Sequence, residues 1–155
     1  MTADAVADEH AIRTLVHRYA DAASRRDPAG VAGTFTVGGV WQSPDLGEYR
    51  GRDSMLEFFT SMLSGWNVFL QGLMSGVVAL DPADPDRAIG RWFVQEIGQR
   101  SEGTRLNISG VYHDEYTRQG GAWLITRRRY DALLRNADGT VTAMPFPTDV
   151  PTIGE

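Results

Sequence analysis

The sequence contains no cysteine and no lysine among its 155 residues. Without cysteine the chain can form no disulfide bond, carry no thiolate nucleophile and offer no sulfur ligand to a metal. Without lysine it can form no Schiff base and use no lysine as a general base. All 15 basic residues are therefore arginines, and 20 acidic residues outnumber them, which gives a formal net charge of −5. This negative charge disfavours nonspecific binding to nucleic acid.

Long hydrophobic runs are also missing. No stretch approaches the roughly 20 apolar residues that a membrane-spanning helix needs, and residues 1–10 are acidic, unlike a signal peptide. These features predict a cytoplasmic protein that binds neither membrane nor nucleic acid. The sequence has no phosphate-binding loop and no spacing typical of metal ligands, so we expect no metal and no cofactor.

Three helices are predicted in the first part of the chain. The first covers residues 11–25, where apolar side chains recur at helical spacing, with Asp8 as its N-cap. A second, short helix begins at Asp27, because aspartate caps it and the following proline fits its first turn, and it includes Phe35. The third covers about residues 53–63.

Strands are predicted in the second part of the chain, where the apolar period changes from helical to alternating. Long strands are expected over residues 69–80 and 87–99. They are followed by a long hairpin over 104–130, whose turn is Gln119-Gly120-Gly121. A short strand at 40–43 precedes the third helix.

Helices followed by long strands with short turns predict an α+β domain. Three N-terminal helices should cover one face of a cone-shaped, curved antiparallel sheet, whose mouth would form a small-molecule pocket. This domain is expected over residues 1–135. Residues 136–155 contain three prolines and are predicted to form an extended C-terminal tail.

The succession of short motifs resembles the SnoaL-like branch of the nuclear-transport-factor-2-like superfamily. The resemblance covers about residues 8–135 and implies a cystatin-like α+β barrel. The family includes ketosteroid isomerases, scytalone dehydratase, hexachlorocyclohexane dehydrochlorinase and polyketide cyclases, which implies a pocket for a hydrophobic molecule. The matching motifs are Arg18-Tyr19-Ala20, Arg26-Asp27, Phe35, Trp41 with Pro44, Tyr49-Arg50-Gly51, Gly110-Val111-Tyr112-His113-Asp114 and Gly121-Ala122-Trp123.

The catalytic residues of these enzymes do not carry over to this sequence. The resemblance places the aspartate and histidine of the dehydratase and the dehydrochlorinase at Ser24 and Gly72, which cannot replace them. The oxyanion-hole tyrosine of the isomerases falls on Tyr19, but their general base falls near Ser43. A reaction in this chain must therefore use other residues.

The densest polar cluster is on the first arm of the hairpin. Alternation directs Tyr112 and Asp114 to one face of the strand and His113 to the other. If the first pair faces the pocket, Asp114 is a candidate general base. The competing interpretation pairs Asp114 with an arginine such as Arg127 or Arg129.

A second candidate base is Glu96, because it shares a strand face with Trp92 and burial there would raise the pKa of its carboxyl group. Tyr19 lies on the apolar stripe of the first helix and is the candidate hydrogen-bond donor. The predicted ligand-binding residues are Trp41, Met74, Trp92, Ile108, Tyr112 and Arg128.

Several classes of function fit these residues. The first is a cofactor-free lyase, isomerase or cyclase acting on a hydrophobic, even polycyclic, substrate. The second is a noncatalytic module for ligand binding or dimerisation. A homodimer would form through the outer face of the sheet, where Phe93 and Ile97 would otherwise be exposed. The third is a small subunit of a larger oxygenase.

Overall fold

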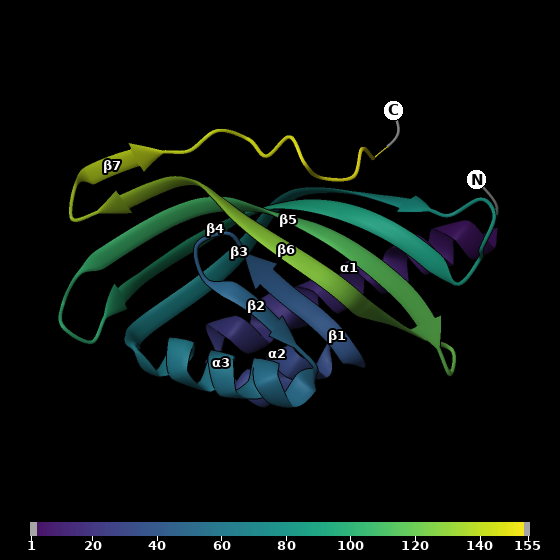
Figure 1. Cartoon of the computed structure of the whole chain (residues 1–155), viewed down its shortest axis with the longest axis horizontal. Coiled ribbons are helices and arrows are strands. Elements are labelled where there is room, and N and C mark those ends of the chain that lie inside the picture. Colours follow the sequence, from purple (N-terminus) through teal and green to yellow (C-terminus); the bar gives the residue numbers. More distant parts are fainter. Residues whose placement is uncertain (1–2, 154–155) are drawn as a thin grey trace.

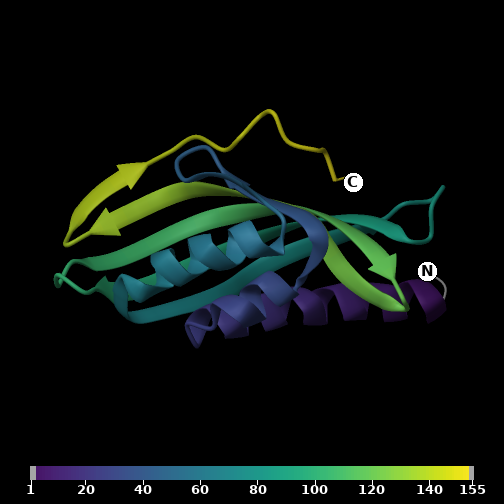
Figure 2. The same cartoon turned by 60° about the horizontal axis from the view of Figure 1, so that its bottom comes forward.

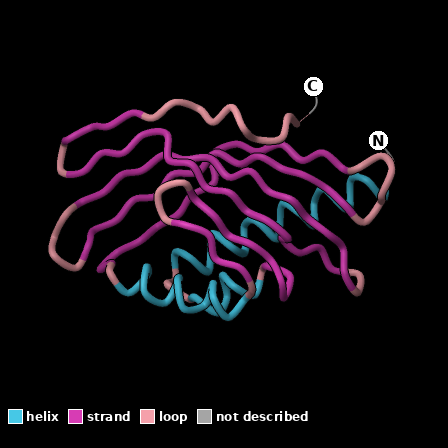
Figure 3. Tube along the Cα trace, viewed as in Figure 1, coloured by secondary structure: helices cyan, strands magenta, loops and turns pink. Residues whose placement is uncertain are grey.

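The expected α+β architecture is confirmed by a computed structural model, which describes residues 3–153. Three helices lie on one face of a single curved sheet (Figures 1 and 3). None of the described helices is long and apolar enough to cross a membrane. In chain order the elements are α1 (Ala3–Ser24), α2 (Pro28–Gly33), β1 (Phe35–Ser43), β2 (Gly47–Arg50), α3 (Arg52–Ser64), β3 (Trp66–Leu80), β4 (Arg87–Arg100), β5 (Arg105–Gln119), β6 (Ala122–Ala137) and β7 (Thr140–Ala143).

The sheet is open and mixed, with the strand order β2-β1-β6-β5-β4-β3 and β7 paired to β6. The strands β3 to β6 form the predicted antiparallel meander, because short turns join them. The prediction of a wholly antiparallel sheet is wrong at one pairing. β1 runs parallel to β6, with Trp41 opposite Arg128. These two strands lie far apart in the sequence, so no turn dictates their relative direction.

α1 lies along the inner face of the sheet, beneath its long strands (Figure 2). The apolar stripe predicted for this helix is confirmed. Ile12, Leu15, Val16, Tyr19 and Ala23 are all buried. This burial is the main stabilisation of the helix, since an amphipathic helix depends on packing of its apolar face.

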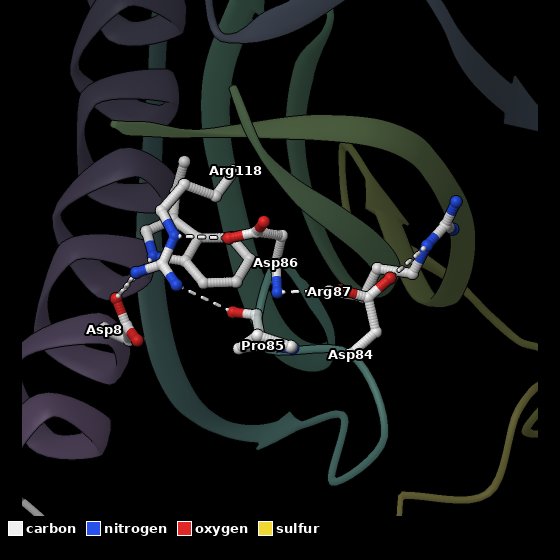
Figure 4. Close-up of polar contacts among 7 residues, drawn as sticks. Asp8, Asp84, Pro85, Asp86, Arg87 and Arg118 are labelled. Atoms are coloured by element: carbon white, nitrogen blue, oxygen red, sulfur yellow. Dashed lines mark hydrogen bonds and ion pairs between the residues drawn. The ribbon is translucent and has the colours of Figure 1, made fainter. Parts of the chain in front are cut away.

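Asp8 does not cap this helix, because α1 begins before it and includes it. The Asp8 carboxylate instead accepts a hydrogen bond from the Arg118 guanidinium at 2.7 Å and another from Nε1 of Trp123 at 3.0 Å. Arg118 also donates to Asp86 at 2.7 Å and to the carbonyl of Pro85 at 3.0 Å (Figure 4). One guanidinium therefore connects α1, β5 and the turn between β3 and β4.

We expect Arg118→Ala to lower the thermal midpoint of unfolding, because it releases three segments of the chain from one another. Arg87→Ala is the matched control, since the Arg87 side chain pairs only with Asp84 in its own turn. Circular dichroism melts of both variants test this. Equal midpoints for the two variants would contradict the connecting role of Arg118.

The segment that contains α2 and the start of β1 matches the prediction only in part. Asp27 caps α2 as predicted, its Oδ1 accepting a hydrogen bond from the Gly30 amide at 2.9 Å. α2 ends at Gly33, however, and Phe35 is the first residue of β1 rather than part of the helix. Phe35 pairs with Ile125 of β6 and is fully buried there. A long-range pairing thus determines the conformation of Phe35.

The C-terminal segment crosses the outer face of the sheet, opposite the helices (Figures 1 and 2). After β7 pairs with β6, the segment beyond Ala143 is held by an ion pair between Arg129 and Asp149 at 2.9 Å. The Phe146 ring packs on His113 and Phe93, with centroid distances of 5.7 and 6.2 Å. The extended tail predicted from the prolines therefore covers part of the outer face.

Candidate functional site

A cavity of about 210 Å³ lies between the helices and the inner face of the sheet. Most of its wall is apolar or aromatic, and most of its polar residues enter from the strands, with Tyr19 from α1 and Asp45 from the turn between β1 and β2. This composition is typical of small-molecule sites, where a few polar groups orient a largely hydrophobic ligand. The residues that line it are Tyr19, Ala23, Val31, Trp41, Ser43, Asp45, Leu46, Phe59, Met62, Leu63, Trp66, Phe69, Gln71, Glu96, Arg100, Ile108, Tyr112, Tyr130, Ala132 and Arg135.

Glu96 is the carboxylate held within this wall. Neighbouring strands place Gln71 opposite Glu96, and Nε2 of Gln71 donates to Oε1 of Glu96 at 3.0 Å. The Tyr130 hydroxyl donates to the other carboxylate oxygen at 3.3 Å. Burial raises the pKa of Glu96 to about 7, although the hydrogen bonds from Gln71 and Tyr130 act in the opposite direction. Both protonation states of Glu96 are therefore accessible near neutral pH, as acid–base catalysis requires.

Tyr130 reaches Glu96 because Gly110 leaves room for its ring. A Cβ atom at Gly110 would lie 2.5 Å from a carbon of the Tyr130 ring. Neither Tyr130 nor Gln71 is a site residue predicted from the sequence. Alternation along their strands could have indicated that both face inward, but not that they meet at one carboxylate.

Two further phenols, Tyr19 and Tyr112, line the cavity beside this carboxylate. Their rings meet edge to face at a centroid distance of 5.7 Å. Nε2 of Gln71 also lies 2.9 Å from the Tyr112 hydroxyl oxygen, which accepts a hydrogen bond from it. Burial raises the pKa of both phenols, so they stay protonated and can act as donors at neutral pH.

Arg128 lies behind these two rings and is fully buried. Its guanidinium carbon is 4.2 Å from the Tyr19 ring centroid and 4.0 Å from that of Tyr112. It forms two hydrogen bonds with Asp114, of 2.8 and 2.6 Å. Burial lowers the pKa of Arg128, but the Asp114 carboxylate outweighs this effect and raises it. Arg128 is therefore a charged part of the core.

Asp114 is engaged on both oxygens and does not line the cavity, so its role as a base stays a prediction that this placement does not favour. Besides Arg128, the Tyr116 hydroxyl donates to Asp114 at 2.5 Å and in turn accepts from Nε1 of Trp92 at 2.7 Å. The competing interpretation, an arginine partner, is confirmed, but with Arg128 rather than Arg127 or Arg129. The reason is alternation along β6, which directs only the middle arginine of the three inward.

The other predicted site residues differ in where they lie relative to the cavity. Tyr19, Trp41, Glu96, Ile108 and Tyr112 line the cavity, and their functional roles stay predictions. Trp92 and Arg128 are buried behind this wall and do not line the cavity, and their contact with a ligand also stays a prediction.

Met74, also predicted to bind a ligand, does not line the cavity and is 56% exposed. Alternation explains this, because Leu73 before it faces inward, and a β-bulge between Leu73 and Ser75 leaves Met74 without a paired residue on β4. His113 faces away from the cavity as predicted, and the tail residue Phe146 covers it.

The positions of the family's aspartate and histidine are filled by groups that cannot transfer a proton in their place. The Ser24 hydroxyl accepts a hydrogen bond from the backbone N–H of Gln71 at 2.9 Å. Gly72 lies on an exposed part of β3, so the inward residue at this level is Gln71, one position earlier. Among residues 3–153, no group of three or more His, Asp or Glu side chains could hold a metal ion.

The architecture is an α+β domain with a cavity between its helices and one curved sheet. The chain belongs to the SnoaL-like domain family, whose model matches residues 4–129. No curated protein matches the sequence.

Solved structures show the same fold. A candidate scytalone dehydratase from Novosphingobium aromaticivorans has a TM-score of 0.81 at 19% identity, covering 98% of this chain and 100% of its own. A candidate aromatic ring hydroxylase from the same organism has a TM-score of 0.78 at 25% identity, covering 90% and 94%. The hexachlorocyclohexane dehydrochlorinase LinA-type3 from Novosphingobium barchaimii has a TM-score of 0.74 at 20% identity, covering 96% and 98%.

Proposed function

We propose that this protein is a cofactor-free acid–base enzyme, a lyase or isomerase, with Glu96 as its general base. The observation that carries the proposal is a carboxylate inside an apolar cavity, with a pKa of about 7 and two hydrogen-bonding neighbours that fix its orientation. A general base is most effective when its pKa lies near the working pH. The similarity to dehydratase and dehydrochlorinase structures supports this class of reaction.

In the proposed reaction Glu96 removes a proton from a substrate carbon. The carboxyl group then returns that proton or passes it to a leaving group. Negative charge that develops on a substrate oxygen would be stabilised by the hydroxyl of Tyr19 or Tyr112, both of which line the cavity. Gln71 positions the carboxylate and the Tyr112 hydroxyl together, because one amide nitrogen contacts both.

The volume of the cavity limits the substrate. An apolar protein cavity of about 150 Å³ accommodates benzene, and the cavity here measures about 210 Å³. The proposed substrate is therefore one substituted ring rather than the polycyclic molecule considered from the sequence.

The test is a panel of ring compounds with a carbonyl group, incubated with the protein in heavy water. Proton NMR follows exchange or elimination of the hydrogen next to the carbonyl. Turnover that requires Glu96 supports the proposal. Turnover that is unchanged in Glu96→Gln contradicts it.

We also propose that two copies of the chain associate through the outer face of the sheet. Val68, Leu70 and Ile97 lie on β3 and β4 and are 50%, 55% and 47% exposed. Phe93, expected to contribute, is instead partly covered by the Phe146 ring. The remaining apolar patch is one that a monomer would not gain by exposing.

Light scattering at micromolar concentration should therefore give the mass of a dimer, and the double variant Leu70→Glu/Ile97→Glu should give that of a monomer. Charges placed on both partners repel one another across a symmetric interface. Leu56→Glu, on an exposed position of α3, is the control and should leave the dimer intact. A monomeric wild-type protein would rule out this interface.

A further inference from the structure

Two arginines that line the cavity form no hydrogen bond or ion pair through their side chains within the described part of the chain. Only four arginine side chains in the described part of the chain form no hydrogen bond or ion pair, namely Arg18, Arg91, Arg100 and Arg135. Two of these four, Arg100 and Arg135, line the cavity. The other two lie elsewhere, on α1 and on β4.

The placement of Arg100 is defined by its neighbours rather than by a carboxylate. Its guanidinium carbon lies 4.4 Å from the ring centroid of Trp66, which also lines the cavity. Such a cation–π contact holds the cation without a hydrogen bond, and none of its N–H groups donates to an acceptor in the described part of the chain. Arg100 is therefore prearranged for an acceptor from outside the chain.

Arg135 lines the same cavity from another strand, β6. Through the pairings of β4 with β5 and of β5 with β6, it lies two strands away from Glu96 on the same level. Arg100 lies four residues beyond Glu96 on β4, which is about 13 Å along the strand. The two guanidinium groups thus approach the cavity from different strands. Both lie near the C-terminal ends of their strands, β4 and β6, which point toward the same edge of the sheet.

The acidic groups of the cavity do not neutralise these arginines. Glu96 is occupied by Gln71 and Tyr130. Asp45 lines the cavity from the turn between β1 and β2 but forms no ion pair with a described residue. Two arginines with free donors on the wall of an apolar cavity favour an acceptor-only group, and a carboxylate matches their geometry.

We infer that Arg100 and Arg135 bind the anionic group of the substrate, and that the substrate is a ring-bearing carboxylate. The ring occupies the apolar part of the cavity near Trp41 and Phe59, and the carboxylate contacts the two guanidinium groups. This inference rests on the proposed use of the cavity for a substrate and adds its chemical class. It also explains how a protein of net charge −5 attracts an anion.

The experiment compares 3-phenylpropanoate with 3-phenylpropanamide, which share a ring and differ in charge. Their binding to the full chain is measured by titration calorimetry and by intrinsic tryptophan fluorescence, to which two of the four tryptophans, Trp41 and Trp66, contribute from the cavity wall. The carboxylate should bind at least about 10-fold more tightly than the amide, since hydrogen bonds between charged groups are the strong ones.

Arg100→Gln and Arg135→Gln should each remove most of this preference and leave binding of the amide unchanged. Arg18→Gln, which changes net charge equally outside the cavity, should keep the preference. Equal binding of the two compounds, or a preference that persists in the Arg100→Gln/Arg135→Gln double variant, would overturn the inference. Failure of both compounds to bind at millimolar concentration would overturn it together with the proposed use of the cavity.

The same titrations in Glu96→Gln separate the inference from the proposed reaction. A carboxylate preference that depends on both arginines supports the anion site, whether or not turnover requires Glu96. If turnover requires Glu96 but the preference is absent, the proposed function stands and the anion site fails.

Discussion

Glu96→Gln should reduce turnover by about 10²- to 10⁴-fold, which is the usual contribution of a general base. Glutamine keeps the shape of the side chain and can still accept the hydrogen bond from Gln71, so the cavity should be preserved. What it loses is the ability to accept a proton. The measurement is the rate of hydrogen exchange or elimination for a substrate identified in the heavy-water panel.

The same substitution should change the pH dependence of stability. The folded-state pKa of Glu96 is about 7, against an ordinary value of 4.5. Between these values the folded protein binds more protons than the unfolded chain, so the free energy of unfolding falls as pH rises. Over this window the loss amounts to about 3 kcal/mol. Glu96→Gln has no such group and should be more stable than wild type above pH 7.

Urea unfolding at pH 5 and pH 8 checks this second effect. Wild type should lose stability between the two pH values by more than Glu96→Gln does. Glu102→Gln removes an exposed carboxylate on the turn between β4 and β5 and should behave like wild type. A variant that loses both turnover and stability at every pH would show that Glu96 has a structural role instead of a catalytic one.

Local patterns in the sequence were sufficient for much of the fold. The apolar stripe of α1, the glycine turn of the hairpin and the split of Tyr112 and Asp114 from His113 are confirmed, because each depends on residues close together in the chain. Alternation within one strand fixes which face a side chain occupies.

The candidate site was harder to predict because it is assembled over long separations. Glu96 meets Gln71 across 25 positions and Tyr130 across 34. No local pattern specifies that these three strands align their inward residues at one level. The β-bulge at Met74 is a similar case, since no local pattern in the sequence marks the inserted residue.

Asp114→Ala should destabilise the protein by about 3–5 kcal/mol, the usual cost of leaving one charge of a buried ion pair without its partner. Arg128 and Asp114 both have fully buried side chains, and the contact between them is 2.6 Å. The substitution would leave a guanidinium without a counter-charge in the core and deprive Tyr116 of its acceptor. Chemical denaturation measures the loss.

A double variant shows whether the loss of stability comes from the unpaired Arg128 charge or from the missing Asp114 side chain. Asp114→Leu/Arg128→Met removes both charges and should recover most of the stability, because buried ion pairs can often be replaced by apolar residues at little cost. Glu48→Ala removes one partner of an exposed pair with Arg50 and should change stability by less than about 1 kcal/mol. A small loss in Asp114→Ala, similar to that control, would contradict the buried pair.

Turnover by Asp114→Asn below its melting temperature then separates the two carboxylates by function. Asparagine can still accept hydrogen bonds from Arg128 and Tyr116, but it cannot act as a base. Because Asp114 does not line the cavity, this variant should be less stable than wild type yet retain most of its turnover while folded. The reverse result, wild-type stability with turnover lost, would make Asp114 the base and leave Glu96 a structural residue.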